Sequence, residues 1–178
     1  GLMPNALPEH IQEHSDMVAV LAHALGVIRR DIFHEPCDVN ALATAALYHD
    51  ASEILTGDLP TPIKYHNAEI MSAYHAVEDL AVQKLLGMLP PELRETYADV
   101  LAEDKDGDIY PLVKAADKLS AYIKCIEERK AGNNEFLSAE AQTRAALEAS
   151  PLPEVQYFLE HFIPAFERDL DELGAIGQ

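Results

Sequence analysis

Apolar residues recur every three to four positions along most of this chain, which is the spacing that places them on one face of an α-helix. Segments rich in proline and glycine, such as 56–62 and 150–153, interrupt the pattern because these residues are unsuited to helix interiors. Alternating apolar and polar positions bounded by hairpin turns, which would indicate strands, are absent. The pattern therefore predicts an all-α protein with helices over about 8–32, 41–55, 67–86, 92–102, 109–130, 135–149 and 153–173.

The length of 178 residues fits one domain, and we expect a single helical bundle over residues 1–178. No apolar run reaches the roughly 18 residues needed to cross a bilayer. The first residues lack a basic segment followed by an apolar stretch, as a secretory signal would have. We therefore expect a cytoplasmic protein, with Cys37 and Cys125 as free thiols.

The charge balance is strongly acidic, with 13 Lys and Arg against 31 Asp and Glu and a formal net charge of −18. Binding to a nucleic-acid polymer depends on basic side chains that displace counterions from phosphates. We therefore expect neither a nucleic-acid polymer nor an anionic membrane as partner. A small anionic substrate stays compatible with this charge if a cation in the site offsets the negative field.

Four polar side chains fall on the apolar faces of three predicted helices. His14 precedes Val18 by one helical turn, His49 and Asp50 lie deep in an Ala- and Leu-rich helix, and Asp117 interrupts a third apolar face. Burying a carboxylate is costly unless it is paired or coordinated. The nitrogen and oxygen donors of these residues suit one divalent cation.

The spacing alone leaves two interpretations of these residues open. They could bind a metal ion, or they could form a polar core in which buried basic side chains, such as Lys118 or Lys64, neutralise the carboxylates. A single inward histidine is more often a core residue than a ligand, so the helical pattern does not decide between the two.

The motifs around these residues add a resemblance. The order His14, His49-Asp50, Asp117 recurs together with EHS at 13–15, YHDASE at 48–53, TGDLPTPIKY at 56–65, KAAD at 114–117 and AGNNEF at 131–136. Together these segments closely resemble the bacterial HD-domain 5′-deoxynucleotidases, a branch of the HD-domain metal-dependent phosphohydrolases, which are helical bundles. The resemblance covers nearly the whole chain.

The resemblance implies that one divalent metal ion is bound by four ligands: His14, His49, Asp50 and Asp117. Relatives favour Co²⁺ or Mn²⁺, whereas two imidazoles and two carboxylates also suit Fe²⁺, Ni²⁺ or Zn²⁺. Glu53 matches the residue proposed to act on the attacking water. The segment Asp58, Leu59, Pro60 and Thr61 matches the loop that contacts the deoxyribose and phosphate.

The activity implied is hydrolysis of deoxyribonucleoside 5′-monophosphates to a deoxynucleoside and inorganic phosphate. Two alternatives stay open: an HD-domain hydrolase acting on a nucleoside triphosphate or cyclic dinucleotide, and a non-catalytic helical module that the metal only stabilises. Relatives form homodimers, and exposed apolar positions near the C-terminus, such as Phe158, Phe162 and Phe166, could form the interface or could belong to the core. The family also places an Arg-Trp pair upstream of the segment that matches Leu2-Met3, so that pair falls outside this sequence.

Overall fold

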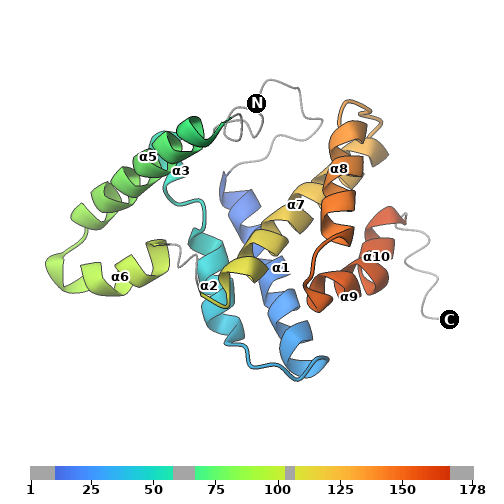
Figure 1. The fold of residues 1–178 in the computed structure, drawn as a ribbon, viewed down its shortest axis with the longest axis horizontal. Helices are drawn as coiled ribbons and strands as arrows, with labels where there is room; N and C mark the ends of the chain where they lie inside the picture. Colours follow the sequence, from blue (N-terminus) through green and yellow to red (C-terminus); the bar gives the residue numbers. More distant parts are fainter. Residues whose placement is uncertain (1–10, 58–66, 103–106, 169–178) are drawn as a thin grey trace.

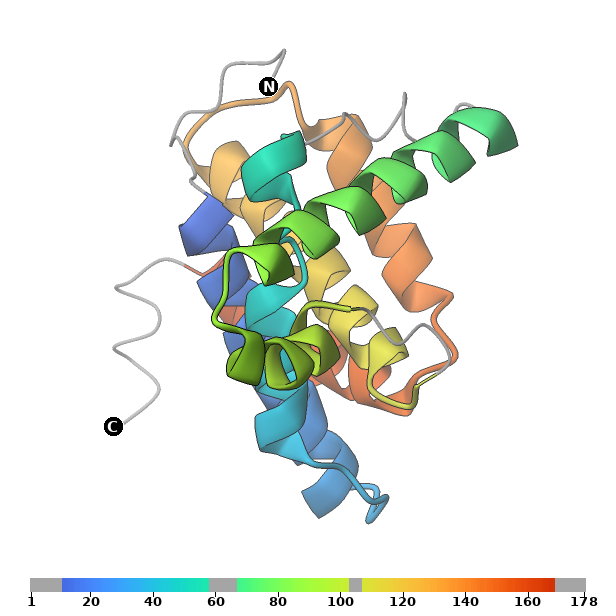
Figure 2. The ribbon, with the colours of Figure 1, turned by 90° about the vertical axis from the view of Figure 1, so that its left-hand side faces the viewer.

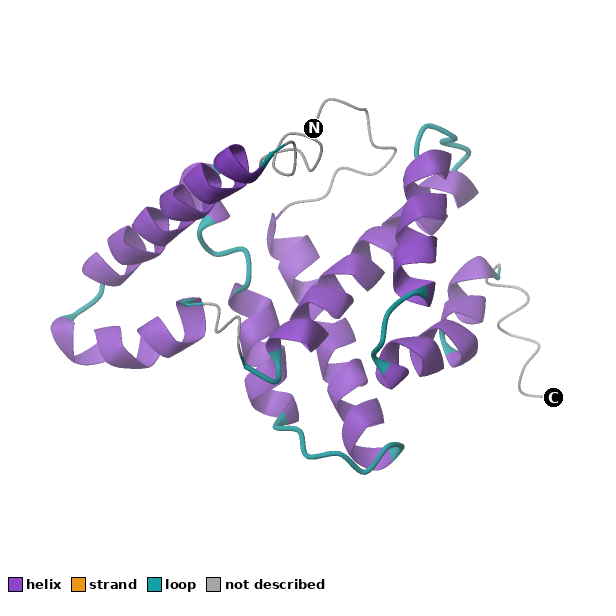
Figure 3. Ribbon diagram, viewed as in Figure 1, coloured by secondary structure: helices purple, strands orange, loops and turns teal. Residues whose placement is uncertain are grey.

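The structure is a computed structural model that describes residues 11–57, 67–102 and 107–168. This part of the chain is helical, with no strand among the described residues (Figure 3). The predicted all-α class is therefore confirmed. In chain order the elements are α1 (Ile11–Asp31), α2 (Val39–Tyr48), α3 (Glu53–Thr56), α5 (Ala68–Gly87), the 3₁₀ turn η1 (Pro91–Leu93), α6 (Arg94–Leu101), α7 (Tyr110–Lys130), α8 (Leu137–Glu148), α9 (Pro153–His161) and α10 (Ile163–Glu167).

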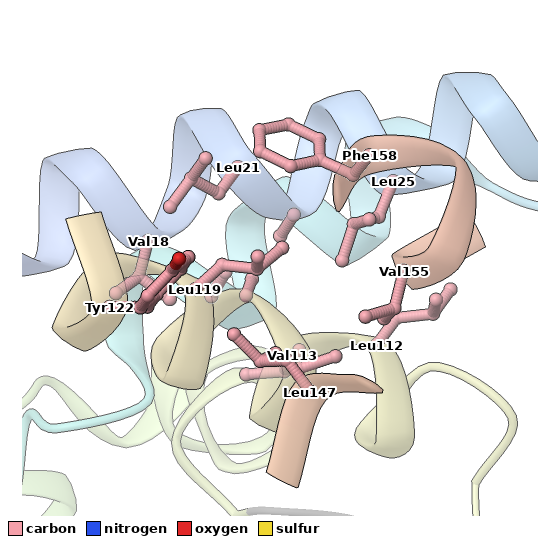
Figure 4. Close-up of a cluster of buried hydrophobic side chains, with 14 of the residues drawn as sticks. Val18, Leu21, Leu25, Leu112, Val113, Leu119, Tyr122, Leu147, Val155 and Phe158 are labelled. Atoms are coloured by element: carbon pink, nitrogen blue, oxygen red, sulfur yellow. The ribbon is translucent and has the colours of Figure 1, made fainter. Parts of the chain in front are cut away.

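The core lies where α1, α2 and α7 pack together, and α8, α9 and α10 cover one side of it (Figure 1). Figure 4 shows the apolar side chains that α1, α7, α8 and α9 contribute to it. Burying each large side chain of this kind contributes about 1.5–3 kcal/mol. The members labelled there are Val18, Leu21, Leu25, Leu112, Val113, Leu119, Tyr122, Leu147, Val155 and Phe158.

A glycine on α1 sets the close approach of α2. A Cβ atom at Gly26 would lie 2.9 Å from Cδ2 of Leu42, which is fully buried. Asp38 fixes the start of α2, because its carboxylate accepts hydrogen bonds from the backbone N–H groups of Asn40 and Ala41. The C-terminal end of α2 is thereby directed along α1 toward the first turns of that helix.

The helix predicted over 41–55 is divided in the structure, and His49 is involved in the break. Its Nδ1 lies 2.7 Å from the carbonyl oxygen of Ala46, the atom that a continuing α-helix would pair with the N–H of Asp50. The backbone instead makes i→i+3 bonds, from Ala51 to Tyr48 and from Glu53 to Asp50, each 3.0 Å. The chain turns between α2 and α3, which separates the His49-Asp50 pair from regular helix.

The helix predicted over 153–173 is divided as well. Pro164 has no N–H, and its ring would clash with the carbonyl four residues earlier in a continuous helix. The structure accordingly ends α9 at His161 and begins α10 at Ile163, with Pro164 in the first turn of α10. Residues 169–173 of the predicted helix lie outside the described part of the chain.

The remaining elements, α3, α5 and α6, stand to one side of the core (Figures 1 and 2). α3 contacts α5, α5 contacts α6, and α6 packs against α2. This arrangement leaves α5 facing the junction of α2 and α7. None of the helices among the described residues is both long and apolar enough to cross a bilayer. Cys37 and Cys125 are free thiols, as the sequence predicts.

Candidate metal centre

The structure brings the four side chains singled out in the sequence into one cluster. Nε2 of His14 lies 3.2 Å from Oδ1 of Asp117 and 3.5 Å from Oδ2 of Asp50. Nε2 of His49 lies 3.2 Å from Oδ2 of Asp50 and 3.9 Å from Oδ1 of Asp117. The first turns of α1, the chain just after α2 and the middle of α7 therefore meet at one point.

His49 is held in the orientation that a metal ligand needs. The Ala46 carbonyl can only accept a hydrogen bond, so Nδ1 of His49 carries the proton and Nε2 presents its lone pair. The side chain is 1% exposed, and Nε2 is buried without a hydrogen-bond partner among the described residues. Metal-binding histidines commonly donate their other N–H to a backbone carbonyl in this way.

A longer contact through Nδ1 also orients His14. Its Nδ1 lies 3.4 Å from the hydroxyl oxygen of Ser120, which is buried on α7 one turn after Asp117. The ring therefore presents Nε2 toward Asp50 and Asp117. The two imidazole rings are tilted by 53°, with centroids 5.5 Å apart. Two nitrogens on different helices thus face the same two carboxylates.

The charges in the cluster perturb its titration. Burial alone would lower the pKa of His49, but Asp50, Asp117 and the Ala46 carbonyl outweigh burial and raise that pKa above its usual value. Burial alone would raise the pKa of Asp50, but His49, His14 and Lys114 outweigh it and lower that pKa. The cluster therefore favours an ionised carboxylate, which is the form that binds a cation.

The donor set fits a divalent ion. One atom each from His14, His49 and Asp50 lie within 4.8 Å of one another, and Asp117 reaches both imidazoles. Bonds of about 2.1 Å to a common ion separate neighbouring ligand atoms by about 3.0–3.4 Å. The observed distances of 3.2–3.9 Å are near that range. An ion at this point would also give the buried Nε2 of His49 a partner.

A cleft of about 610 Å³ opens beside the cluster. This volume lies within the range of about 300–1,000 Å³ that is usual for small-molecule sites. Its walls come from α5 on one side and from the junction of α2, α6 and α7 on the other. The described residues that line it are His49, Asp50, Ser52, Met71, His75, Glu78, Asp79, Val82, Gln83, Leu101, Ala102, Tyr110 and Lys114.

Glu53 follows Ser52, which lines this cleft, and it does not share a continuous helix with His49. It is the first residue of α3, half-buried, and its N–H donates to the carbonyl of Asp50. The predicted substrate loop, Asp58, Leu59, Pro60 and Thr61, lies outside the described residues. The chain leads into it through Gly57, whose φ of +69° is favourable only for glycine, and the Gly57 carbonyl accepts a bond from the Tyr74 hydroxyl.

The sequence alone did not assign several residues to the site. Lys114 and Ser120 lie on α7 to either side of Asp117, and the helical spacing of three places all three on one side of the helix. His75 lines the cleft from α5, where its Nδ1 lies 2.8 Å from Oε2 of Glu78. Lys118, one of the basic partners considered for a polar core, is exposed. The other, Lys64, lies outside the described residues.

Comparison with known proteins decides the family. Residues 1–166 match the family described as 5′-deoxynucleotidase YfbR-like. The chain belongs to this family. Members of this YfbR-like family from Shigella boydii and Escherichia coli, both named 5′-deoxynucleotidase YfbR, are 49% identical to it over 174 residues. Each alignment spans 97% of this chain and 87% of the relative.

Solved structures agree with this family. An HD-domain phosphohydrolase from Listeria innocua matches with a TM-score of 0.82 and 26% identity, over 94% of this chain and 81% of that one. A conserved hypothetical protein from Pyrococcus furiosus shares the fold, with a TM-score of 0.64 and 23% identity over 92% and 86% of the two chains. The predicted HD-domain hydrolase class is therefore confirmed. The HD-domain family is metal-dependent, which agrees with the donor cluster found here.

Proposed function

We propose that this YfbR-like protein removes the 5′-phosphate from deoxyribonucleoside 5′-monophosphates, giving a deoxynucleoside and inorganic phosphate. The observation that carries the proposal is the meeting of two imidazoles and two carboxylates at the side of a cleft of about 610 Å³. Relatives that are 49% identical are named for this activity, which supports the choice of substrate.

His14, His49, Asp50 and Asp117 would hold the divalent ion, with Co²⁺ or Mn²⁺ as the proposed metal and Fe²⁺, Ni²⁺ or Zn²⁺ as the other suitable ions. Hydrolysis of a phosphate monoester is so slow in water that enzymes accelerate it by as much as ~10²¹-fold. A bound divalent ion supplies charge stabilisation on the phosphoryl oxygens, which is the largest single contribution such a site can make.

Glu53 is the proposed general base. Its backbone N–H is bonded to the carbonyl of Asp50, which places the residue three positions beyond a proposed metal ligand. There it would position the attacking water and accept its proton, an effect worth about 10²–10⁴-fold in rate. Glu53 is half-buried at the start of α3 and follows Ser52, which lines the cleft.

The segment from Asp58 to Thr61 is the proposed sugar- and phosphate-binding loop. Asp58 would accept a hydrogen bond from the 3′-hydroxyl and leave no room for a 2′-hydroxyl, which would exclude ribonucleotides. The bond between Tyr74 and the Gly57 carbonyl supports this role, because it anchors the start of the loop to α5, a wall of the cleft.

We also propose a homodimer located in the cytoplasm. Of the three aromatic positions considered for an interface, Phe158 is buried and Phe166 is half-buried, so both belong mainly to the core. Phe162 lies between α9 and α10 and is 43% exposed. Its ring is stacked on that of Phe158, with the ring centroids 4.9 Å apart. This ring therefore supports an interface at the C-terminal end of the described chain.

The test is a phosphate-release assay with deoxyribo- and ribonucleoside monophosphates in the presence of several divalent metals. We expect phosphate from deoxyribonucleotides alone, and none after removal of the metal by a chelator. Glu53→Gln should abolish turnover while its metal content stays at the wild-type level. Glu69→Gln, an exposed change in the first turn of α5, is the matched control and should retain full activity.

Three outcomes would contradict the proposal. Release of triphosphate from a nucleoside triphosphate, or a linear product from a cyclic dinucleotide, would indicate another HD-domain hydrolase. Bound metal without phosphate release from any substrate would indicate a metal-stabilised helical module. Loss of metal in Glu53→Gln would make Glu53 a ligand rather than a base.

A further inference from the structure

The charges that line the cleft are poorly suited to a dianionic phosphate. Among the described residues that line the cleft, three carry carboxylates: Asp50, Glu78 and Asp79. A divalent ion in the centre would have its two positive charges matched by Asp50 and Asp117. The whole chain carries a net charge of −18, so its overall field is also negative. Phosphate binding therefore needs a further cation inside the cleft.

Lys114 is the one lining residue with a permanent positive charge among the described parts of the chain. It precedes Asp117 by three residues on α7, so the two side chains leave the helix on the same side, one turn apart. Its Nζ lies 5.5 Å from the ring centroid of Tyr110, which also lines the cleft. This contact places the ammonium group beside an aromatic ring of the cleft wall.

Lys114 also lies near the metal cluster, because it lines the same cleft as His49 and Asp50. Lys118, one turn further along α7, is exposed and does not line the cleft. The helix therefore offers one lysine to the site and a second, of the same chemistry, to solvent.

We propose that Lys114 binds the phosphate group of the substrate, on the side of the cleft wall away from α5 and next to the metal cluster. The proposal rests on the function proposed above, and it assigns to Lys114 the binding of charge rather than proton transfer. A lysine suits this role because its ammonium group is a compact point charge with three donors. Tyr110 would hold the lysine stem while the ammonium group contacts phosphoryl oxygens.

Three variants test the proposal: Lys114→Gln, Lys114→Arg, and Lys118→Gln as the matched control on the same helix. Hydrogen bonds to charged groups contribute about 1.5–3 kcal/mol, which corresponds to roughly 10- to 140-fold in affinity. We expect Lys114→Gln to raise the KM for a deoxyribonucleoside monophosphate by that factor. We expect Lys114→Arg to recover most of the loss, and Lys118→Gln to match wild type.

Product inhibition separates phosphate binding from a structural effect. In Lys114→Gln, the inhibition constant of inorganic phosphate should rise by the same factor as the KM. The inhibition constant of the deoxynucleoside product should stay unchanged, because it carries no phosphate. Equal weakening of both products, or no weakening of either, would overturn the proposal.

A direct binding measurement keeps this test independent of turnover. Titration of the Mn²⁺-loaded protein with inorganic phosphate, followed by calorimetry, should show weaker binding in Lys114→Gln than in wild type and Lys118→Gln. If wild type binds phosphate in this way but hydrolyses no deoxyribonucleotide, the proposed function fails while the role of Lys114 stands. Equal phosphate affinity in all three proteins would overturn the role of Lys114 alone.

Discussion

Replacement of His49 by asparagine separates the roles of its two ring nitrogens. The asparagine side-chain N–H can take over the bond that Nδ1 of His49 makes to the Ala46 carbonyl, but the change removes Nε2, which is buried without a described hydrogen-bond partner. Metal binding should therefore be lost while the turn between α2 and α3 is retained.

These two contacts set the expected change in the free energy of unfolding. In the metal-free protein, loss of part of the ring costs about 1 kcal/mol through the space left behind. Removal of an unsatisfied buried nitrogen returns about 1–3 kcal/mol. The free energy of unfolding of metal-free His49→Asn should thus differ from that of metal-free wild type by at most about 2 kcal/mol.

The increase in Tm on metal binding should differ more clearly between wild type and His49→Asn. At a free metal concentration 100 times the Kd, binding to the native state adds about 2.7 kcal/mol. For a domain of this size, 1 kcal/mol shifts the Tm by about 2–4 °C, so wild type should gain about 5–11 °C. His49→Asn should gain nothing.

Differential scanning calorimetry near pH 8, with and without Mn²⁺ after treatment with a chelator, measures both quantities. His23→Asn on the exposed side of α1 is the matched control and should respond to metal like wild type. A wild-type Tm that does not change with any divalent metal, or an undiminished increase in Tm in His49→Asn, would contradict metal binding by His49.

Further predictions concern the core, the pH dependence and the sugar. Arg29→Ala should lower the free energy of unfolding by about 3–5 kcal/mol in urea titrations, because it leaves the buried carboxylate of Glu154 unpaired, whereas exposed Arg30→Ala should change it by less than about 0.5 kcal/mol. The raised pKa of His49 stabilises the metal-free protein at low pH, and this contribution is lost as the pH rises through that pKa. Because protons compete with the metal, the Tm gain on adding Mn²⁺ should instead grow over the same pH range, and a gain independent of pH would contradict this. Asp58→Ala should raise the kcat/KM for ribonucleotides toward that for deoxyribonucleotides, and an unchanged preference would exclude the proposed sugar contact.

The sequence contained most of the information that locates the metal cluster. The helical spacing placed His14 and Asp117 on inward faces, and the structure brings them to 3.2 Å from each other. The sequence could not decide between a metal site and a paired polar core, because that choice depends on three-dimensional burial. Lys118 is exposed, and the buried Nε2 of His49 has no hydrogen-bond partner in the described part of the chain, so both observations favour a metal site.

Local features that depend on side-chain contacts were harder to predict. The break after α2 arises where a histidine ring lies against a backbone carbonyl, which apolar periodicity does not reveal. The break before α10 could have been predicted from Pro164. Lys114 and His75 were missed because only the packing of α5 and α6 beside α7 makes a cleft of their surroundings. The extent of one domain over residues 1–178 stays a prediction, because both ends lie outside the described residues.

We propose that His14, His49, Asp50 and Asp117 together bind one catalytic metal ion. Anomalous diffraction from crystals of the Mn²⁺-loaded protein, recorded near the manganese absorption edge, tests it most directly. We expect a single strong peak enclosed by the two Nε2 atoms and the two carboxylates, and we expect the peak to be lost in His49→Asn. A peak elsewhere, for example at His75 and Glu78, or a fully active enzyme without a peak among the four side chains, would contradict it.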